Sequence, residues 1–285
     1  MAIDPQKLRA LAIPDVAQRY TERDAILYAL GVGLGHDPLD GRQLRFVYEK
    51  DLQVLPTFAV ALAASPFLLR DPAAGIDFQK VVHGEQGLVL HRPLAPRGHV
   101  VGRQRIVDVV DKGAGKGALL YTERVLADAD SGETIATLTQ TIFCRGDGGF
   151  GGEPRATPAP HPLPDRAPDL VCDLATRPET ALIYRLSGDL NPLHADPAFA
   201  RGAGFERPIL HGLATFGVCG HAILRTLCGY EPMRLRAIAG RFSAPVFPGE
   251  TIRTEIWRAG GSVSFRARVI GRDIVALNHG RAEVV

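Results

Sequence analysis

The sequence predicts an α+β protein made of two tandem copies of one fold. In segment 263–269 apolar residues alternate with polar ones, as is typical of an antiparallel strand with one buried face, and similar strands are expected over 100–110, 119–126 and 134–143. Residues 209–224 carry no formal charge, which predicts a helix buried on all sides. Three short segments of the first half recur in order in the second half. We therefore expect each copy to be a helical segment followed by an antiparallel meander.

The repeated segments lie at offsets of 156, 158 and 152 residues, which agree within the length of a loop change. Residues 28–30, 57–60 and 93–98 correspond to 184–186, 215–218 and 245–249. Between Gly146 and Pro168 there are five glycines and six prolines, a composition that favours neither a helix nor a central strand. The predicted units are therefore residues 1–145 and 169–285, joined by a linker over 146–168.

Composition fits two modest globular domains. The chain has 285 residues, of which 46% are hydrophobic and 22% charged. A formal net charge of +2 favours neither nucleic acid nor an anionic membrane as a partner. The start of the chain lacks the design of a signal peptide, and no segment is long enough for a membrane span. The four cysteines have neither disulfide nor zinc-ligand spacing and fit a reducing cytoplasm.

The run from Tyr184 to His194 is the strongest candidate for chemistry. Thr176 and Glu179 have the spacing of a capping box, which predicts a helix that Gly188 can end in a left-handed turn. Asp196, followed by proline, is typical of a residue that caps the start of another helix. Residues 189–195 are therefore expected to form a short bridge fixed at both ends.

Asp189 and His194 lie five residues apart on this bridge. A carboxylate and a neutral imidazole can polarise one water together, which contributes roughly 10² to 10⁴ in rate. The alternative is that Asp189 only caps a turn through its own backbone and that His194 only packs against the fold.

Gly212 lies near the start of the expected buried helix. A glycine there leaves a free backbone N–H at the positive end of the helix dipole, with no side chain in the way of a ligand. Such an N–H can donate a hydrogen bond to an oxyanion. Close packing is the alternative reason for a glycine at this position.

Several other patterns do not reach the level of a site. Residues 31–36 lack one glycine of a dinucleotide fingerprint and follow a helical pattern where a strand is required. Residues 113–117 lack the leading glycine and the Ser/Thr of a P-loop, and predict a hairpin turn. His83, His91 and His99 have no Cys or carboxylate grouping for a metal site. No metal and no cofactor are implied.

The block Tyr-x-Leu-Ser-Gly-Asp-x-Asn-Pro-Leu-His over residues 184–194, with Pro-Ile-Leu-His-Gly-Leu over 208–213, closely resembles the hydratase 2 motif of the MaoC-like (R)-specific enoyl-CoA hydratases. Segments 27–33, 47–49, 55–58, 83–86 and 111–113 resemble the amino-terminal half of the two-hot-dog subgroup. The resemblance covers nearly the whole chain. It implies a tandem hot-dog fold, in which each antiparallel sheet wraps around a central helix.

The resemblance also implies a reaction, the hydration of trans-2-enoyl-CoA to (3R)-3-hydroxyacyl-CoA and its reverse. Asp189 and His194 would hold the attacking water, and the Gly212 N–H would bind the thioester carbonyl oxygen. At the first offset, Asp189 falls opposite Gly33 and His194 opposite Pro38, so the first copy lacks the catalytic dyad. We expect that this copy, over residues 25–70, was reshaped into a tunnel for medium, long or bulky acyl chains of fatty acid or related lipid metabolism.

Five further residues are expected at the substrate. Asn191 would order the loop or the water, while the resemblance places His83, Gly84, Lys112 and Phe242 at the ligand. Lys112 could meet a phosphate of coenzyme A as a point charge, or be a solvated turn lysine; Phe242 could pack on the pantetheine arm or fill the core. Two arginines, at positions 207 and 241, are further candidates for the phosphates.

Two alternatives remain beside the hydratase. One is a dehydratase for acyl carrier protein or short branched CoA esters; the other is a hot-dog protein that binds acyl-CoA without chemistry. The expected assembly is a homodimer, by analogy with hot-dog sheets that pair edge to edge. Since the chain has no peroxisomal address at its end, the resemblance favours a bacterial cytoplasmic enzyme.

Overall fold

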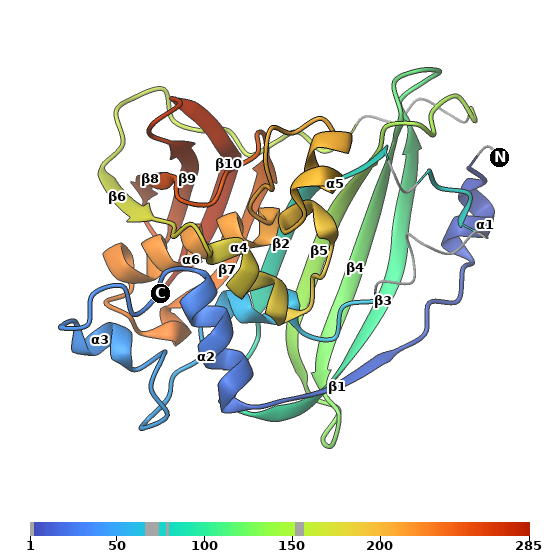
Figure 1. The fold of residues 1–285 in the computed structure, drawn as a ribbon. Coiled ribbons are helices and arrows are strands. Elements are labelled where there is room, and N and C mark those ends of the chain that lie inside the picture. The colour runs from blue at the N-terminus through green and yellow to red at the C-terminus, as the bar shows by residue number, and fades with distance from the viewer. Residues whose placement is uncertain (1–2, 66–73, 78–79, 152–156) are drawn as a thin grey trace.

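One ten-stranded antiparallel sheet is the framework of the protein, and the long helix α6 lies against the strands of the second half (Figure 1). In this computed structural model the described residues are 3–65, 74–77, 80–151 and 157–285. The strands are β1 (Val16–Tyr20), β2 (Val81–Leu90), β3 (Gly98–Asp111), β4 (Ala118–Asp128), β5 (Thr134–Cys144), β6 (Leu170–Ala175), β7 (Leu235–Phe242), β8 (Thr251–Ala259), β9 (Ser262–Val269) and β10 (Ile274–Val284). The helices are α1 (Pro5–Arg9), α2 (Glu22–Gly31), α3 (Gly41–Leu44), η1 (Pro56–Ala61), α4 (Thr180–Tyr184), η4 (Arg185–Ser187), η5 (Pro192–His194), α5 (Pro197–Gly202), α6 (Gly212–Leu227) and η6 (Pro232–Arg234).

The order of the strands shows the duplication directly. Across the sheet the order is β1-β3-β4-β5-β2-β7-β10-β9-β8-β6. Read inward from its own edge, the first half has the order β1-β3-β4-β5-β2 and the second half has the order β6-β8-β9-β10-β7. Each strand of the first half therefore corresponds to the strand of the second half whose number is five higher. The predicted strands at 100–110, 119–126, 134–143 and 263–269 are confirmed as β3, β4, β5 and β9. The tandem α+β fold is confirmed as well.

The two halves join through β2 and β7, which the sequence analysis did not foresee. Residues 85–89 pair antiparallel with residues 237–241, so the two sheets become one. A salt bridge supports this junction, because Arg241 Nη2 lies 2.6 Å from Glu85 Oε1. The second half is therefore continuous with the first half through main-chain hydrogen bonds.

The central helices of the halves differ in length. The expected buried helix of the second half is α6, and residues 214–224 within it are all buried. Its counterpart in the first half is η1, a 3₁₀ helix of six residues that ends at Leu62, where the backbone becomes extended. The first half therefore keeps the position of a central helix but only a short piece of it.

Two glycines of α6 allow the halves to share one core. A Cβ on Gly217 would lie 2.5 Å from a methyl group of Val32, and a Cβ on Gly220 would lie 2.6 Å from a methyl group of Thr57. A side chain at either position would push the first half away from the helix. Tyr28 and Tyr184, which occupy equivalent positions in the two copies, also meet there, with ring centroids 5.7 Å apart.

His221 links the halves in a way that depends on pH. Its side chain is buried, with Nδ1 3.2 Å from the Val32 carbonyl oxygen and Nε2 3.3 Å from the Tyr230 hydroxyl. Burial lowers the pKa of His221 from 6.5 to about 4. Because this pKa is lower in the folded protein, the unfolded chain takes up a proton at a higher pH than the folded one. The contribution of neutral His221 to the free energy of unfolding is therefore complete above pH 6.5, and roughly 3 kcal/mol of it is lost as the pH falls toward 4.

We expect His221→Gln to remove this part of the acid sensitivity. The variant should be less stable than the wild type at pH 7, with the difference narrowing as the pH falls to 4.5. Urea unfolding at both pH values measures it. Parallel dependences of the two proteins on pH would contradict the prediction.

In the part of the chain that the structure describes, no helix combines the length and the apolar character that a bilayer crossing requires. The four cysteines are buried and free.

Candidate active site

The bridge that carries Asp189 is fixed at both ends, although one end differs from the prediction. Helix α4 begins at Thr180, and the chain continues through η4 to Gly188, whose φ of 119° gives the expected left-handed end. Thr176 does not start this helix, so the capping-box prediction is wrong. Its hydroxyl instead donates to the Glu250 carbonyl oxygen at 2.8 Å and accepts the N–H of Gly249, which ties it to the turn before β8.

The other end of the bridge agrees with the prediction. The side-chain oxygen of Asn191 accepts the Leu193 N–H at 3.1 Å, so Asn191 caps the start of η5. The Asp196 carboxylate accepts the N–H groups of Ala198 and Phe199, which confirms it as the cap of α5. Asp189 and His194 are thus carried by a backbone with little freedom.

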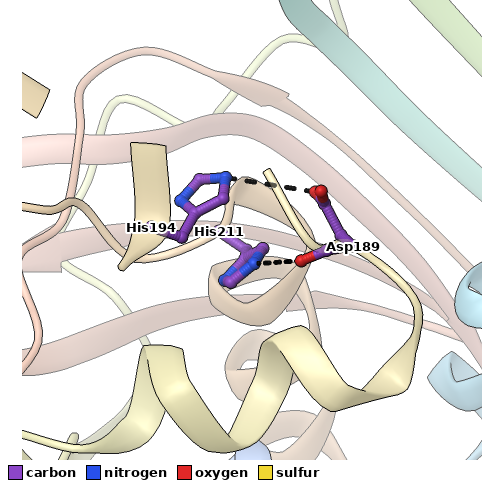
Figure 2. A group of neighbouring side chains, drawn as sticks. All are labelled: Asp189, His194 and His211. Atoms are coloured by element: carbon purple, nitrogen blue, oxygen red, sulfur yellow. Dashed lines mark hydrogen bonds and ion pairs between the residues drawn. The ribbon is translucent and has the colours of Figure 1, made fainter. Parts of the chain in front are cut away.

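His194 and Asp189 face each other (Figure 2), with Nε2 and Oδ2 4.0 Å apart. His194 Nδ1 lies 2.9 Å from the Ile209 carbonyl oxygen. A carbonyl only accepts hydrogen bonds, so Nδ1 carries the proton and Nε2 presents a lone pair. Two acceptors at this separation cannot bond to each other, but one water between them can donate to both.

The burial of the two groups differs in a useful way. The His194 side chain is buried, and burial lowers its pKa below the ordinary 6.5, which keeps the ring neutral at pH 7. The Asp189 side chain is 50% exposed, so water can reach it. Its Oδ1 accepts the Asn191 N–H at 3.1 Å, so the turn-capping alternative also holds, for this oxygen alone. Oδ2 is left for the water.

His211 is part of this site, although no sequence pattern predicted a role for it. Its Nε2 lies 3.1 Å from the Asp189 carbonyl oxygen and therefore carries a proton (Figure 2). Its ring stacks on His194 with centroids 3.6 Å apart and an interplanar angle of 26°. The pKa of His211 is lowered to about 3. Burial is the larger cause, and the neighbouring His194 is the next. In the sequence, His211 directly precedes the glycine that starts the buried helix. This position could have indicated a buried, neutral ring that supports Asp189 and His194.

Gly212 is the first residue of α6, as expected, and its N–H has no acceptor among the described residues. A Cβ at this position would lie 3.3 Å from the Phe242 ring. The same ring meets His83 edge to face, with centroids 4.9 Å apart. The structure therefore brings Gly212, Phe242 and His83 together and supports the packing interpretation of Gly212, while its role as a donor stays a prediction.

His83 and Gly84 sit at an irregularity of β2. The register of β2 against β5 shifts between His83 and Glu85, and His83 Nε2 lies 3.0 Å from the Glu85 carbonyl oxygen. A Cβ on Gly84 would lie 3.0 Å from the Thr141 carbonyl oxygen, so the close approach of β5 favours glycine. Burial lowers the pKa of His83 to about 4, which keeps the ring neutral.

The three cations named for the phosphates lie in different settings. Lys112 is exposed on the turn between β3 and β4. Within the described part of the chain, no hydrogen bond or ion pair joins it to Asp189, His194 or His211. Arg241 is engaged by Glu85 at the β2–β7 junction. Arg207 is half exposed and lies over the Phe247 ring at 4.7 Å.

Asp189, His194 and His211 each have one atom that could bind a metal ion, and these three atoms lie within 4.8 Å of one another. This spacing is also found in metal sites. Each histidine, however, has one nitrogen facing a backbone carbonyl oxygen. This fixes the tautomers and leaves one nitrogen for other partners on each ring. The arrangement suits the relay of a proton through water without requiring an ion.

Comparisons with known proteins agree over the whole chain. Residues 18–146 match the family described as the MFE-2 hydratase 2 N-terminal domain, and residues 160–278 match the MaoC like domain. The chain is 43% identical to 3-hydroxyacyl-thioester dehydratase Y of Mycobacterium tuberculosis, over 100% of this chain and 99% of that protein. It is 38% identical to the peroxisomal enoyl-CoA hydratase 2 of Arabidopsis thaliana, over 95% of this chain and 92% of the relative. The crystal structure of a MaoC-like dehydratase from Phytophthora capsici superposes with a TM-score of 0.87 at 33% identity and covers 99% and 98% of the two chains.

Proposed function

Because this chain belongs to the MaoC-like enoyl-CoA hydratases of the hydratase 2 type, we propose that Asp189, His194 and the Gly212 N–H catalyse its reaction. The reaction is the reversible, (R)-specific hydration of trans-2-enoyl-CoA to (3R)-3-hydroxyacyl-CoA. The observation that carries the assignment is the pair of acceptors, Asp189 Oδ2 and His194 Nε2, 4.0 Å apart beside the start of α6.

In the proposed mechanism, the water donates one hydrogen bond to each of these acceptors and directs its own lone pair at C3 of the enoyl group. The thioester carbonyl oxygen accepts the Gly212 N–H, which stabilises enolate character as charge leaves the double bond. The water loses a proton to the dyad as its oxygen bonds to C3, and a proton is delivered to C2 from the same face. Dehydration uses the same groups in reverse.

The test is direct. Purified protein mixed with crotonyl-CoA should remove the enoyl absorbance, and chiral analysis should find the 3R alcohol. A protein that binds the ester without any loss of absorbance would be the non-catalytic alternative. A 3S product would contradict the proposed geometry.

We propose that the first half, which lacks the dyad, receives the acyl chain, and that medium, long or bulky chains are preferred. The support is its short η1 in place of a long central helix. Large side chains introduced within residues 25–65 should slow turnover of long chains more than that of crotonyl-CoA; residues 66–70 of the predicted tunnel lie outside the described part. Equal effects on long and short substrates would contradict the proposal.

One relative is named a 3-hydroxyacyl-thioester dehydratase, which favours a second candidate, dehydration of carrier-linked esters. The chemistry at the dyad would be the same. Comparing kcat/KM for matched CoA and acyl carrier protein esters separates the two candidates. A clear preference for the carrier-linked ester would mean that the acyl group is delivered by the carrier protein and not by CoA.

For the CoA ester, we propose that His83, Gly84 and Phe242 line the thioester end, that Asn191 orders the catalytic loop, and that Lys112 meets a phosphate. Lys112→Ala should then raise KM for the CoA ester without changing kcat, and should leave the KM of a phosphate-free pantetheine ester unchanged. Equal KM effects on both esters would contradict a phosphate contact.

We further propose a homodimer in a bacterial cytoplasm. The mycobacterial relative supports the setting, and the two edge strands, β1 and β6, offer places for pairing between subunits. Light scattering gives the mass in solution, and a monomer at assay concentration would contradict the dimer.

The acid limb of kcat/KM is expected below pH 6.5. Burial lowers the pKa of His194, so its ring stays neutral above that value and is lost as an acceptor only as the pH falls through the lowered pKa. Initial rates of crotonyl-CoA hydration across the acidic range measure the limb. A limb centred above pH 6.5 would mean that His194 is not the group that titrates.

His211 is expected to act through its neighbours. His211→Phe should keep a ring against His194 but lose the donor to the Asp189 carbonyl oxygen, a hydrogen bond worth about 1 kcal/mol. We expect a loss of about fivefold in kcat with little change in KM. His211→Gln, which can retain a donor, is the matched control and should recover part of kcat at the same thermal stability. If both variants lose kcat only in proportion to lost stability, the role of His211 is structural.

A further inference from the structure

A buried polar row crosses the sheet of the first half between two separate apolar clusters. Every second residue of β4 from position 118 to 126 is buried. Ala118 and Leu120 belong to a cluster with Ile3 and Leu8, whereas Leu126 belongs to the main core. The two buried residues between them, at positions 122 and 124, are polar.

The neighbouring strands continue this row. Register places Thr122 beside Gln140 and Gln140 beside Gln86, and the Gln140 side-chain amide donates to Gln86 Oε1 at 3.1 Å. Gln86 Nε2 in turn donates to the carbonyl oxygens of Gly87 and Thr139. We call Gln86, Gln140, Thr122 and Arg124 the polar row. One hydrogen bond joins the two amides and backbone carbonyl oxygens accept from Gln86, so the member of the row without a balancing partner is the cation.

Arg124 is 5% exposed, and its one hydrogen-bond partner among the described residues is the Val60 carbonyl oxygen, 2.8 Å from Nη2. Its Nε is buried without an acceptor, and no carboxylate within the described ranges forms an ion pair with it. Burial lowers the pKa of Arg124 to about 10, so the group stays charged at neutral pH. Buried charges in proteins are normally paired, because an unpaired one loses its hydration without compensation.

The polar row is connected to the catalytic end of the molecule. His83 lies on β2 opposite Ile142, and Gln86 lies opposite Gln140, so both side chains share the face of β5 residues 140 and 142. The ring of His83 meets Phe242, which lies against Gly212. The charges of Asp189 and Arg124 both act on the pKa of His83, which Asp189 raises and Arg124 lowers. Arg124 is therefore within electrostatic reach of the site where the thioester would bind.

We propose that Arg124 is the receptor for a carboxylate at the far end of the acyl chain, so that enoyl thioesters ending in a carboxylate are substrates. This inference rests on the proposed function and on the acyl chain entering the first half. The apolar clusters on either side of the row would receive the methylene chain. Arg124 would then gain the anionic partner that it lacks among the described residues.

The chemistry of the group favours a carboxylate over a neutral oxygen. A guanidinium presents its donors in a planar fork that matches the two oxygens of a carboxylate. Its Nε–H lies on the same edge of that fork as Nη2, and Nε has no acceptor within the described residues. A hydroxyl or ketone could accept from only part of this edge and would leave the charge uncompensated.

The first experiment uses the wild-type enzyme. A series of trans-2-enoyl-CoA esters of increasing length is prepared in methyl-ended and carboxylate-ended forms, and kcat/KM is measured for each. The carboxylate-ended ester should exceed its methyl-ended partner by about 10- to 100-fold at the length that reaches Arg124 and should be worse at shorter lengths. Preference for the methyl-ended ester at every length would overturn the inference without any variant.

The second experiment uses Arg124→Gln, with Arg105→Gln as the matched control. Arg105 lies on β3, is exposed and pairs with Glu123, so its loss removes the same charge from the surface of the same half. We expect Arg124→Gln to lose the about 10- to 100-fold advantage of the carboxylate-ended ester while methyl-ended turnover is retained. Arg105→Gln should keep the advantage. Should Arg124→Gln fold poorly, Arg124→Lys keeps the charge without the fork and should retain only part of the advantage.

The outcomes separate this inference from the proposed function. If Arg124 only supports the end of η1 through Val60, its variants will lower turnover of both series equally, and the inference fails. If methyl-ended esters are hydrated but no carboxylate-ended ester is preferred, the inference fails and the hydratase stands. If neither series is hydrated, the proposed function itself fails.

Discussion

Asp189→Asn is expected to lose about 10²- to 10⁴-fold in kcat for enoyl-CoA hydration. The carboxamide oxygen can still accept the Asn191 N–H and keep the turn. An amide NH₂ in place of Oδ2, however, donates where the water needs an acceptor. The fold should therefore survive while the water loses half of its support. Initial rates with crotonyl-CoA measure the loss, and near-ultraviolet circular dichroism checks the fold.

His194→Gln should cost a similar factor, and the double variant should lose little more than the worse single one. In the proposed mechanism the two groups act on one water, and residues that act as a unit are strongly non-additive. Asp196→Asn is the matched control. It makes the same chemical change seven residues away, at a helix cap where asparagine is equally suitable, and should leave turnover intact. Full additivity of the single losses, or wild-type turnover in either, would defeat the assignment.

The parts of the site that the sequence predicted are those fixed by local signals. Gly188 ends a helix because its backbone is left-handed, and Asp196 starts one because its carboxylate satisfies two free N–H groups. Each depends on residues within four positions. The uncharged run of α6 was equally clear, since a helix apolar on all sides must be buried.

The parts that the sequence did not predict depend on distant partners. Thr176 has the spacing of a helix cap, but its hydroxyl is bound by residues 249 and 250, more than seventy positions away. The pairing of β2 with β7 and the stacking of His211 on His194 are likewise contacts between remote segments. Arg124 is a charged residue on the buried face of β4, and its burial depends on packing by segments remote in the sequence, such as Val60.

Gly212→Pro is expected to remove the oxyanion donor with little disturbance of the fold. Gly212 is the first residue of α6, where proline is tolerated because its missing N–H has no partner within the helix. The preceding His211 has φ −58° and ψ 137°, the conformation that proline favours in its neighbour. Loss of one such donor typically costs about 2.7 to 4 kcal/mol in the transition state, or about 10²- to 10³-fold in kcat.

Gly212→Ala is the control that separates the donor from the space around it. It keeps the N–H but adds a Cβ 3.3 Å from the Phe242 ring, which must give way by a few tenths of an ångström. If the N–H is the oxyanion donor, Gly212→Ala loses far less kcat than Gly212→Pro, while both unfold at similar urea concentrations. If both lose the same factor, packing against Phe242 explains the glycine and the donor lies elsewhere. Full activity of the proline variant would remove Gly212 from the mechanism altogether, because no amide hydrogen would then remain at that position to stabilise the enolate.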